Sequence, residues 1–169
     1  MPSQFAFNEL LRELCQHEKI VHVDQLQASG RLLVGKHHVH IMYEENIDPQ
    51  SIEVQVDLGE IPEAGTETLL CALMMSNFIY GRCGRSVSSI DPQTGNIAMT
   101  MRLPFAPTLT GSDLAEDLRR AVRQVDALWA EAMEKLNATS VKENRFHPAM
   151  LPSRTSLVPH RFKHGTSCA

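Results

Sequence analysis

The stretch from Glu67 to Gly81, which reads ETLLCALMMSNFIYG, decides the fold. Between Leu69 and Tyr80 it holds ten apolar residues, interrupted only by a serine and an asparagine. A helix with one face in water carries more polar residues than this. A membrane-spanning helix needs roughly 20 apolar residues, so the stretch is too short to be one. The sequence therefore predicts a helix that is apolar on more than one face.

At 100° per residue this helix has two apolar faces. The first face, which can cover a sheet, comprises Leu69, Ala72, Leu73 and Tyr80. The second face comprises Leu70, Cys71, Met74, Met75 and Phe78. Leaving such side chains in water forgoes ~1.5–3 kcal/mol each. We therefore expect a second copy of the chain to bury the second face in a two-fold homodimer. The alternative is that other parts of the same chain cover both faces.

The remaining elements follow from periodicity. Apolar residues at helical spacing predict a helix over residues 4–17, capped by Ser3, and a long one from Thr110 or Ser112 to about Asn137. Alternating or glycine-flanked runs predict strands within residues 30–35, 37–45, 51–59, 86–90 and 96–104. The order is α-β-β-β-α-β-β-α. It predicts an α+β fold, a twisted antiparallel sheet with helices packed on one face.

Charge and composition divide the chain in two. Residues 1–137 carry a net charge of −8 and suit one α+β domain, whereas residues 138–169 carry +4. This basic segment has three prolines and no periodicity, so we expect a mostly disordered tail. An acidic body argues against nucleic-acid binding. The first eight residues have neither a basic flank nor a long apolar run, so we expect neither a signal peptide nor stable membrane insertion.

Few residues in the sequence are candidates for catalysis or metal binding. The four cysteines show no CxxC spacing, which favours free thiols in a reducing cytoplasm. His38 and His40 share a strand face, with His37 opposite, but no acidic or cysteine partner has metal-ligand spacing. Cys83 lies between two arginines, yet nothing in the sequence positions a base for it. We expect no catalytic residue, no cofactor and no metal.

Two segments carry a resemblance to a known family. They read VDLGEIPEAGTETLLCALMMSNFIYGRCGRSVSSIDPQTGNIAMTMRLP and DLRRAVRQVDALWAEAMEKL. The Leu-Gly-x-Ile-Pro strand end, the Leu-Leu and Asn77 of the central helix, the last hairpin and Trp129 resemble class I chaperones of bacterial type III secretion, typified by the Tir chaperone. The resemblance covers roughly residues 5–137. The tail departs from it, since these chaperones usually end soon after the last helix.

The resemblance implies a cytoplasmic bacterial homodimer that is not an enzyme. Such a chaperone binds an extended N-terminal segment of one or more secreted effectors, here termed the client. It keeps the client secretion-competent and delivers it to the secretion apparatus and its ATPase. Two other readings stay open, a small-molecule-binding or enzymatic α+β dimer and a regulatory protein that docks on the secretion machinery through its tail.

Two sets of site residues are expected from this reading. The dimer interface is the second face of the central helix, with the strand at 86–90 nearby. The client site comprises the outward residues of the early strands and the apolar side chains of the first helix, Phe5, Phe7, Leu10, Leu11 and Leu14. For Leu10 and Leu14, core packing is an equally good explanation.

Overall fold

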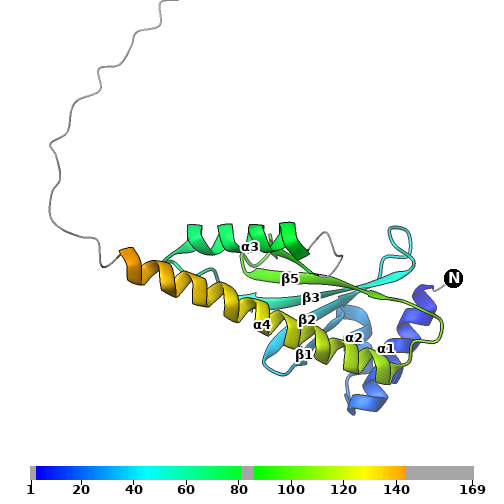
Figure 1. Cartoon of the computed structure of the whole chain (residues 1–169). Helices are drawn as coiled ribbons and strands as arrows, with labels where there is room; N and C mark the ends of the chain where they lie inside the picture. The colour runs from blue at the N-terminus through cyan, green and yellow to red at the C-terminus, as the bar shows by residue number, and fades with distance from the viewer. Residues whose placement is uncertain (1–2, 81–85, 144–169) are drawn as a thin grey trace, which may run out of the picture.

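The computed structural model describes residues 3–80 and 86–143. In chain order the elements are α1 (Gln4–Glu18), α2 (Val23–Ser29), β1 (Arg31–Val34), β2 (His37–Met42), β3 (Ser51–Gly59), α3 (Thr66–Tyr80), β4 (Val87–Ile90), β5 (Ile97–Pro104) and α4 (Gly111–Glu143). The five strands form one antiparallel sheet in the order β1-β2-β3-β5-β4. Helix α4 runs along the length of the molecule beside this sheet (Figure 1). The predicted α+β class and the helices on one face are confirmed.

The sheet has one buried and one exposed face because apolar and polar residues alternate along its strands. On β3, Ile52, Val54 and Val56 are fully buried and point toward the helices. Val54 pairs with Ile41 of β2 and with Met101 of β5, so the apolar side chains form continuous rows across the strands. The alternation predicted for residues 51–59 is therefore correct, and the intervening residues line an outer face.

Helix α1 packs against α4 and closes one end of the core. Its N-terminus is capped as predicted, since the Ser3 hydroxyl accepts a hydrogen bond from the Ala6 N–H at 3.3 Å. The start of α4 lies directly on the α1 backbone, because a Cβ added at Gly111 would clash with backbone atoms of Glu13 and Leu14. Only glycine allows this approach of the two helices.

Two helices differ from the sequence prediction. Helix α2 was not predicted, because it is only two turns long, its N-cap residue makes no side-chain hydrogen bond, and Leu26 is its single buried residue. Helix α4 continues past the expected end at Asn137 to Glu143. The rest of the predicted disordered tail, together with the Cys83 loop, lies outside the described residues.

A buried histidine joins the sheet to α4. His37, which is 8% exposed, lies with Nδ1 3.1 Å from the Asp57 carbonyl oxygen and Nε2 2.9 Å from Asp126 Oδ1. Lys36 Nζ lies 3.0 Å from the same carboxylate oxygen. The hydrogen bonds from His37 and Lys36 lower the pKa of Asp126. The contacts of His37 and Lys36 with Asp126 therefore fix the β1–β2 hairpin against the middle of α4.

Replacing Asp126 by asparagine should lower the free energy of unfolding at pH 7 by about 1 kcal/mol, a value discounted for the partial exposure of this carboxylate. Because the folded-state pKa is lowered, the carboxylate stabilises the fold above roughly pH 5, and this contribution is lost as the pH falls through the folded-state pKa. The difference between wild type and Asp126→Asn should therefore shrink on acidification. Denaturant titrations at several pH values measure it, with Asp117→Asn on the same helix as the control.

Candidate functional site

The outermost strand β1 leaves one backbone edge open for pairing. Within the described residues β1 pairs with β2 alone, and it ends the sheet. An open strand edge presents unpaired N–H and C=O groups at a regular spacing, and an extended peptide can add to it as a further strand.

An apolar groove of about 490 Å³ runs beside this edge, between β1, the end of α1 and the N-terminal half of α4. Its lining comprises Leu14, Glu18, Ile20, Leu32, Leu33, Val34, Gly35, Ala115, Leu118, Arg119, Val122 and Arg123. Leu33 is 63% exposed. Apolar surface therefore extends from the groove out to the solvent at β1.

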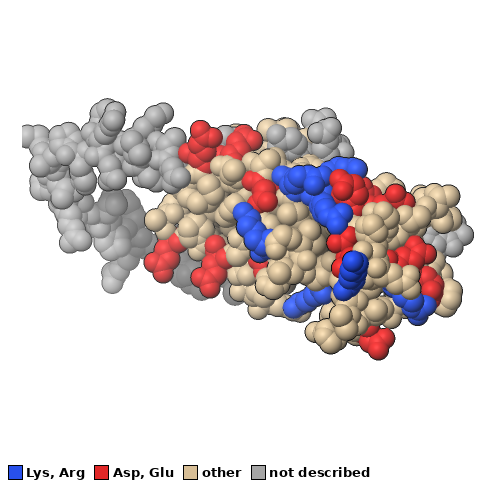
Figure 2. Space-filling model, turned by 90° about the horizontal axis from the view of Figure 1, so that it is seen from below, with Lys and Arg blue, Asp and Glu red and all other residues tan. Residues whose placement is uncertain are grey.

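The charged residues at the rim of the groove neutralise one another. Arg119 Nη2 lies 2.6 Å from Glu18 Oε1, and Arg123 Nη2 lies 3.0 Å from Glu116 Oε1. The hydrogen bond from Arg123 lowers the pKa of Glu116. Figure 2 shows basic and acidic side chains interspersed over this side of the molecule rather than gathered by sign. The groove is therefore built to bind apolar side chains more than charge.

The second apolar face of α3 is exposed in the single chain. Met74, Met75 and Phe78 are 72%, 68% and 70% exposed, whereas Leu69 and Leu73 of the first face are buried. Cys71 is also exposed and Leu70 is half-buried. The two-faced character predicted for this helix is thus present, and no described part of the chain covers the second face.

Helix α3 and strand β4 form one continuous surface. The Asn77 amide donates to the Ser88 carbonyl oxygen at 2.9 Å, and its Oδ1 accepts from the Ser88 N–H at 2.6 Å. This pair of hydrogen bonds uses Asn77 as a strand partner for β4. Val87 and Ile90 of β4 are each 47% exposed. Ile90 pairs with the buried Ile97 and points to the helix side, whereas Val87 pairs with Thr100 and points to the outer face of the sheet.

The predicted client residues of α1 are mostly core residues. Phe7, Leu10, Leu11 and Leu14 are at most 5% exposed and pack in the main hydrophobic cluster. Phe7 also stacks against Tyr43, with ring centroids 5.4 Å apart. Two of the five residues have surfaces that a client could reach, since Phe5 is 74% exposed and Leu14 lines the groove. Core packing is the explanation that this structure supports for the other three.

The remaining sequence expectations concern metals and membranes. His38 and His40 do lie on the outer sheet face, with His37 on the inner one. Among the residues that the structure describes, no three His, Cys, Asp or Glu side chains gather as metal ligands would. In the same ranges, no helix has the length and hydropathy needed to cross a membrane.

Comparisons with known proteins define the class. The model of the Tir chaperone protein (CesT) family matches residues 9–128. A chain in the crystal structure of the ExsC–ExsE complex superposes with a TM-score of 0.52 at 19% identity, covering 71% of this chain and 96% of the other. A chain in the HopA1–SchA chaperone–effector complex gives 0.51 at 10% identity, covering 74% and 94%. No curated protein matches.

The match to this family model over most of the chain, together with the shared fold, defines a type III secretion chaperone. The chain belongs to the Tir chaperone protein (CesT) family. This confirms the resemblance stated from the central helix and the last hairpin.

Proposed function

We propose that the protein binds an extended N-terminal segment of one or more type III effectors at β1 and in the adjoining groove. The observation that carries this proposal is the groove itself, an apolar channel that ends at an unpaired strand edge. Main-chain hydrogen bonds to β1 would give affinity without regard to sequence. The groove would select apolar side chains, and a client held in this way stays unfolded and secretion-competent.

The geometry of β1 sets the pattern that a client must satisfy. Leu32 and Val34 point toward the helices, whereas Leu33 points to the outer face, where it pairs with His38. Residues paired across two strands project to the same side. A client strand opposite β1 would therefore place every second side chain in the groove. The exposed Leu33 would contact a client side chain on the other face.

The same proposal includes a homodimer formed through the surface made by α3 and β4. Support comes from the exposed methionines of α3 and from β4, which ends the sheet on this side. Methionine is flexible and packs well against irregular apolar surfaces. A dimer would present two copies of the client groove. Acting in the bacterial cytoplasm, it would deliver the client to the secretion ATPase.

Replacing Leu33 by glutamate should weaken client binding by at least about tenfold, because a charge would be desolvated where an apolar contact forms. The first hundred or so residues of candidate effectors are coexpressed with the chaperone, and copurification is measured. Ile47→Glu is the matched control, since Ile47 is a similarly exposed residue, 72%, in the loop between β2 and β3.

Secretion in a bacterial strain that lacks the protein completes this test. Loss of effector secretion, restored by wild type and by Ile47→Glu but not by Leu33→Glu, is the expected result. If no effector copurifies and secretion is normal, the chaperone function fails for this chain. A ligand-binding dimer then becomes the leading explanation of the fold.

A further inference from the structure

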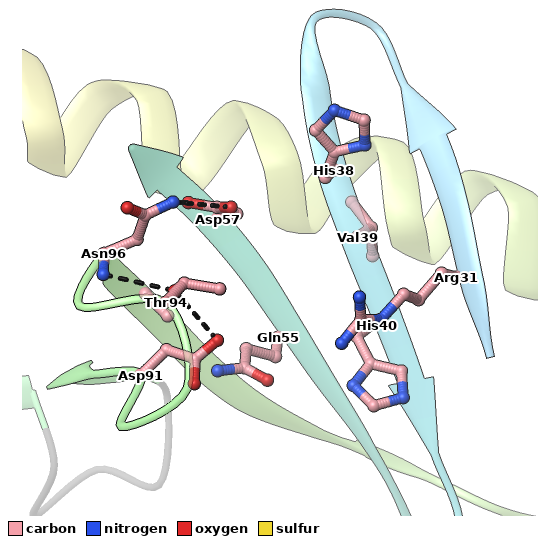
Figure 3. Close-up of a pocket in the computed structure, with 10 residues that line it drawn as sticks. Arg31, His38, Val39, His40, Gln55, Asp57, Asp91, Thr94 and Asn96 are labelled. Carbon is pink, nitrogen blue, oxygen red and sulfur yellow. Dashed lines mark hydrogen bonds between the residues drawn. The ribbon is translucent and has the colours of Figure 1, made fainter. Parts of the chain in front are cut away.

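The outer face of the sheet, opposite the helices, holds a cavity of about 280 Å³ that neither the groove nor the α3–β4 surface uses. Figure 3 shows its walls. A basic wall comes from Arg31 of β1 and His38 and His40 of β2. An acidic wall comes from Asp57 of β3 and Asp91 of the turn between β4 and β5, and Gln55 lies between the two walls.

The basic wall faces the acidic wall across the cavity, and the charge of Arg31 contributes, after the hydrogen bonds from Gln93 and Thr94, to lowering the pKa of Asp91. Arg31 extends across β2, and its guanidinium points toward Gln55 (Figure 3). Within residues 3–80 and 86–143, the side chains of Arg31, His38 and Gln55 take part in no hydrogen bond or ion pair. A guanidinium offers five donors in a planar fork that fits a carboxylate. The wall therefore has unused donors for an anionic group.

His40 is held in place beside Arg31. Its ring packs against Gly30, where an added Cβ would lie 3.0 Å from the ring Cδ2. Burial, and after it the charge of Arg31, lower the pKa of His40. Glu53 and Asp91 act on His40 in the opposite sense, so acidic groups already lie within electrostatic range of this wall. A carboxylate bound between Arg31 and His40 would favour the protonated imidazole.

Hydrogen bonds hold the acidic wall in place. Asp57 accepts hydrogen bonds from the Asn96 amide, 3.1 Å from each carboxylate oxygen, and from the Gly59 N–H at 2.8 Å. Asp91 accepts from the Gln93 N–H at 2.8 Å and from the Thr94 hydroxyl at 3.1 Å. The hydrogen bonds to Asp91 lower its pKa. They also fix the turn that carries Asp91.

We propose that this cavity binds a ligand that carries both charges, with a carboxylate against Arg31 and His40 and an ammonium or guanidinium against Asp57 and Asp91. A single negative charge would meet the acidic wall, and a single positive charge would meet the basic one. The volume lies below the roughly 300–1,000 Å³ of most small-molecule sites, so the ligand is short. A free amino acid and a neighbouring acidic and basic pair in a polypeptide share this chemistry.

The ring signals of His40 report binding directly in a proton–carbon NMR titration, with a His40→Gln variant for assignment. The two probes are L-glutamate and a Glu–Lys dipeptide that is acetylated and amidated at its ends. At least one should shift the His40 signals saturably at millimolar concentration and raise the pKa of His40. Dipeptides in which glutamine replaces either charged residue should bind at least about fivefold more weakly, since each leaves one wall unpaired.

Two variants test the walls separately. Arg31→Gln, at an exposed position, should weaken binding by about tenfold or more. Asp91→Asn should reduce the preference for Glu–Lys over Glu–Gln. Arg12→Gln is the control, because Arg12 is an exposed arginine whose one ion pair within the described residues is with Glu9 on α1. Circular dichroism verifies the fold of each variant.

The two probes distinguish the source of the ligand, and either preference supports the proposal. Tighter binding of free glutamate indicates a small molecule, and tighter binding of the capped dipeptide indicates a polypeptide segment. The proposal is overturned if His40 does not respond to ~20 mM of either probe, which corresponds to a negligible affinity. Equal shifts in wild type and Arg31→Gln would overturn it as well. Neither result depends on effector binding at β1.

Discussion

Placing glutamate at both Met74 and Met75 should convert the protein from a homodimer into a monomer. Both side chains are about 70% exposed in the single chain and lie at the centre of the apolar face of α3. In a two-fold dimer each substitution occurs twice, so four carboxylates would be buried without partners. The cost of burying an unpaired charge exceeds what an interface of this kind supplies. Light scattering at tens of micromolar measures the mass, which is 18.9 kDa for one chain.

Two further variants separate a specific interface from a general effect of charge. Leucine at both methionine positions keeps the face apolar and should leave the dimer intact. Val21→Glu replaces an apolar residue that is even more exposed, 85%, and lies far along the chain from α3, and it should also leave the mass unchanged. A dimer that persists in the double glutamate variant would place the interface elsewhere. A wild-type monomer would refute the dimer itself.

The sequence pattern predicted α3 well, because the high apolar content of this helix largely decides how its residues are buried. A helix with ten apolar residues in twelve needs a cover on more than one face, from its own chain or from another. The inner face, Leu69 and Leu73, and the outer face, Met74 and Met75, therefore separated correctly on a helical wheel. From the sequence, Asn77 could be noted only as part of the family motif, without its structural role. Its two hydrogen bonds to Ser88 depend on where β4 lies.

Helix α1 shows where the same method reaches its limit. Its apolar stripe at every third or fourth residue is the same pattern for a core helix and for a helix that binds a client. What decides between them is the approach of α4, which the clash-free position of Gly111 against Glu13 and Leu14 makes possible. That contact joins residues nearly a hundred positions apart, and no local pattern encodes it. The sequence alone therefore could not distinguish client contact from core packing for Leu10 and Leu11.

The groove and the outer cavity were missed for a related reason. Leu32, Leu33 and Val34 follow one another, so both faces of this strand carry apolar side chains. This pattern indicated apolar surface outside the core. Its meaning depends on β1 lying at the edge of the sheet. The cavity likewise collects Arg31, His40 and Asp91 from three separate segments. Antiparallel pairing and the shape of one turn bring them together, and neither follows from spacing along the chain.

A pair of variants on α1 separates core packing from client contact. Leu10→Ala should lower the free energy of unfolding by about 2–5 kcal/mol, because Leu10 is 3% exposed and its loss leaves a cavity. For a domain of this size that corresponds to a fall in melting temperature of roughly 10 °C. Phe5→Ser should change the melting temperature by little, since Phe5 is 74% exposed. Thermal unfolding followed by circular dichroism measures both.

Client binding should respond to the two substitutions in the opposite way from thermal stability. Because Phe5 projects from the start of α1 into solvent, it is the α1 residue that a bound segment can contact without opening the core. Phe5→Ser should weaken effector copurification if the client extends over α1, with the dimer unchanged. Leu10→Ala should bind a client normally at temperatures where it is still folded. If Leu10→Ala instead keeps wild-type stability and loses the client, Leu10 is a contact residue, and α1 must move away from α4 when the client binds.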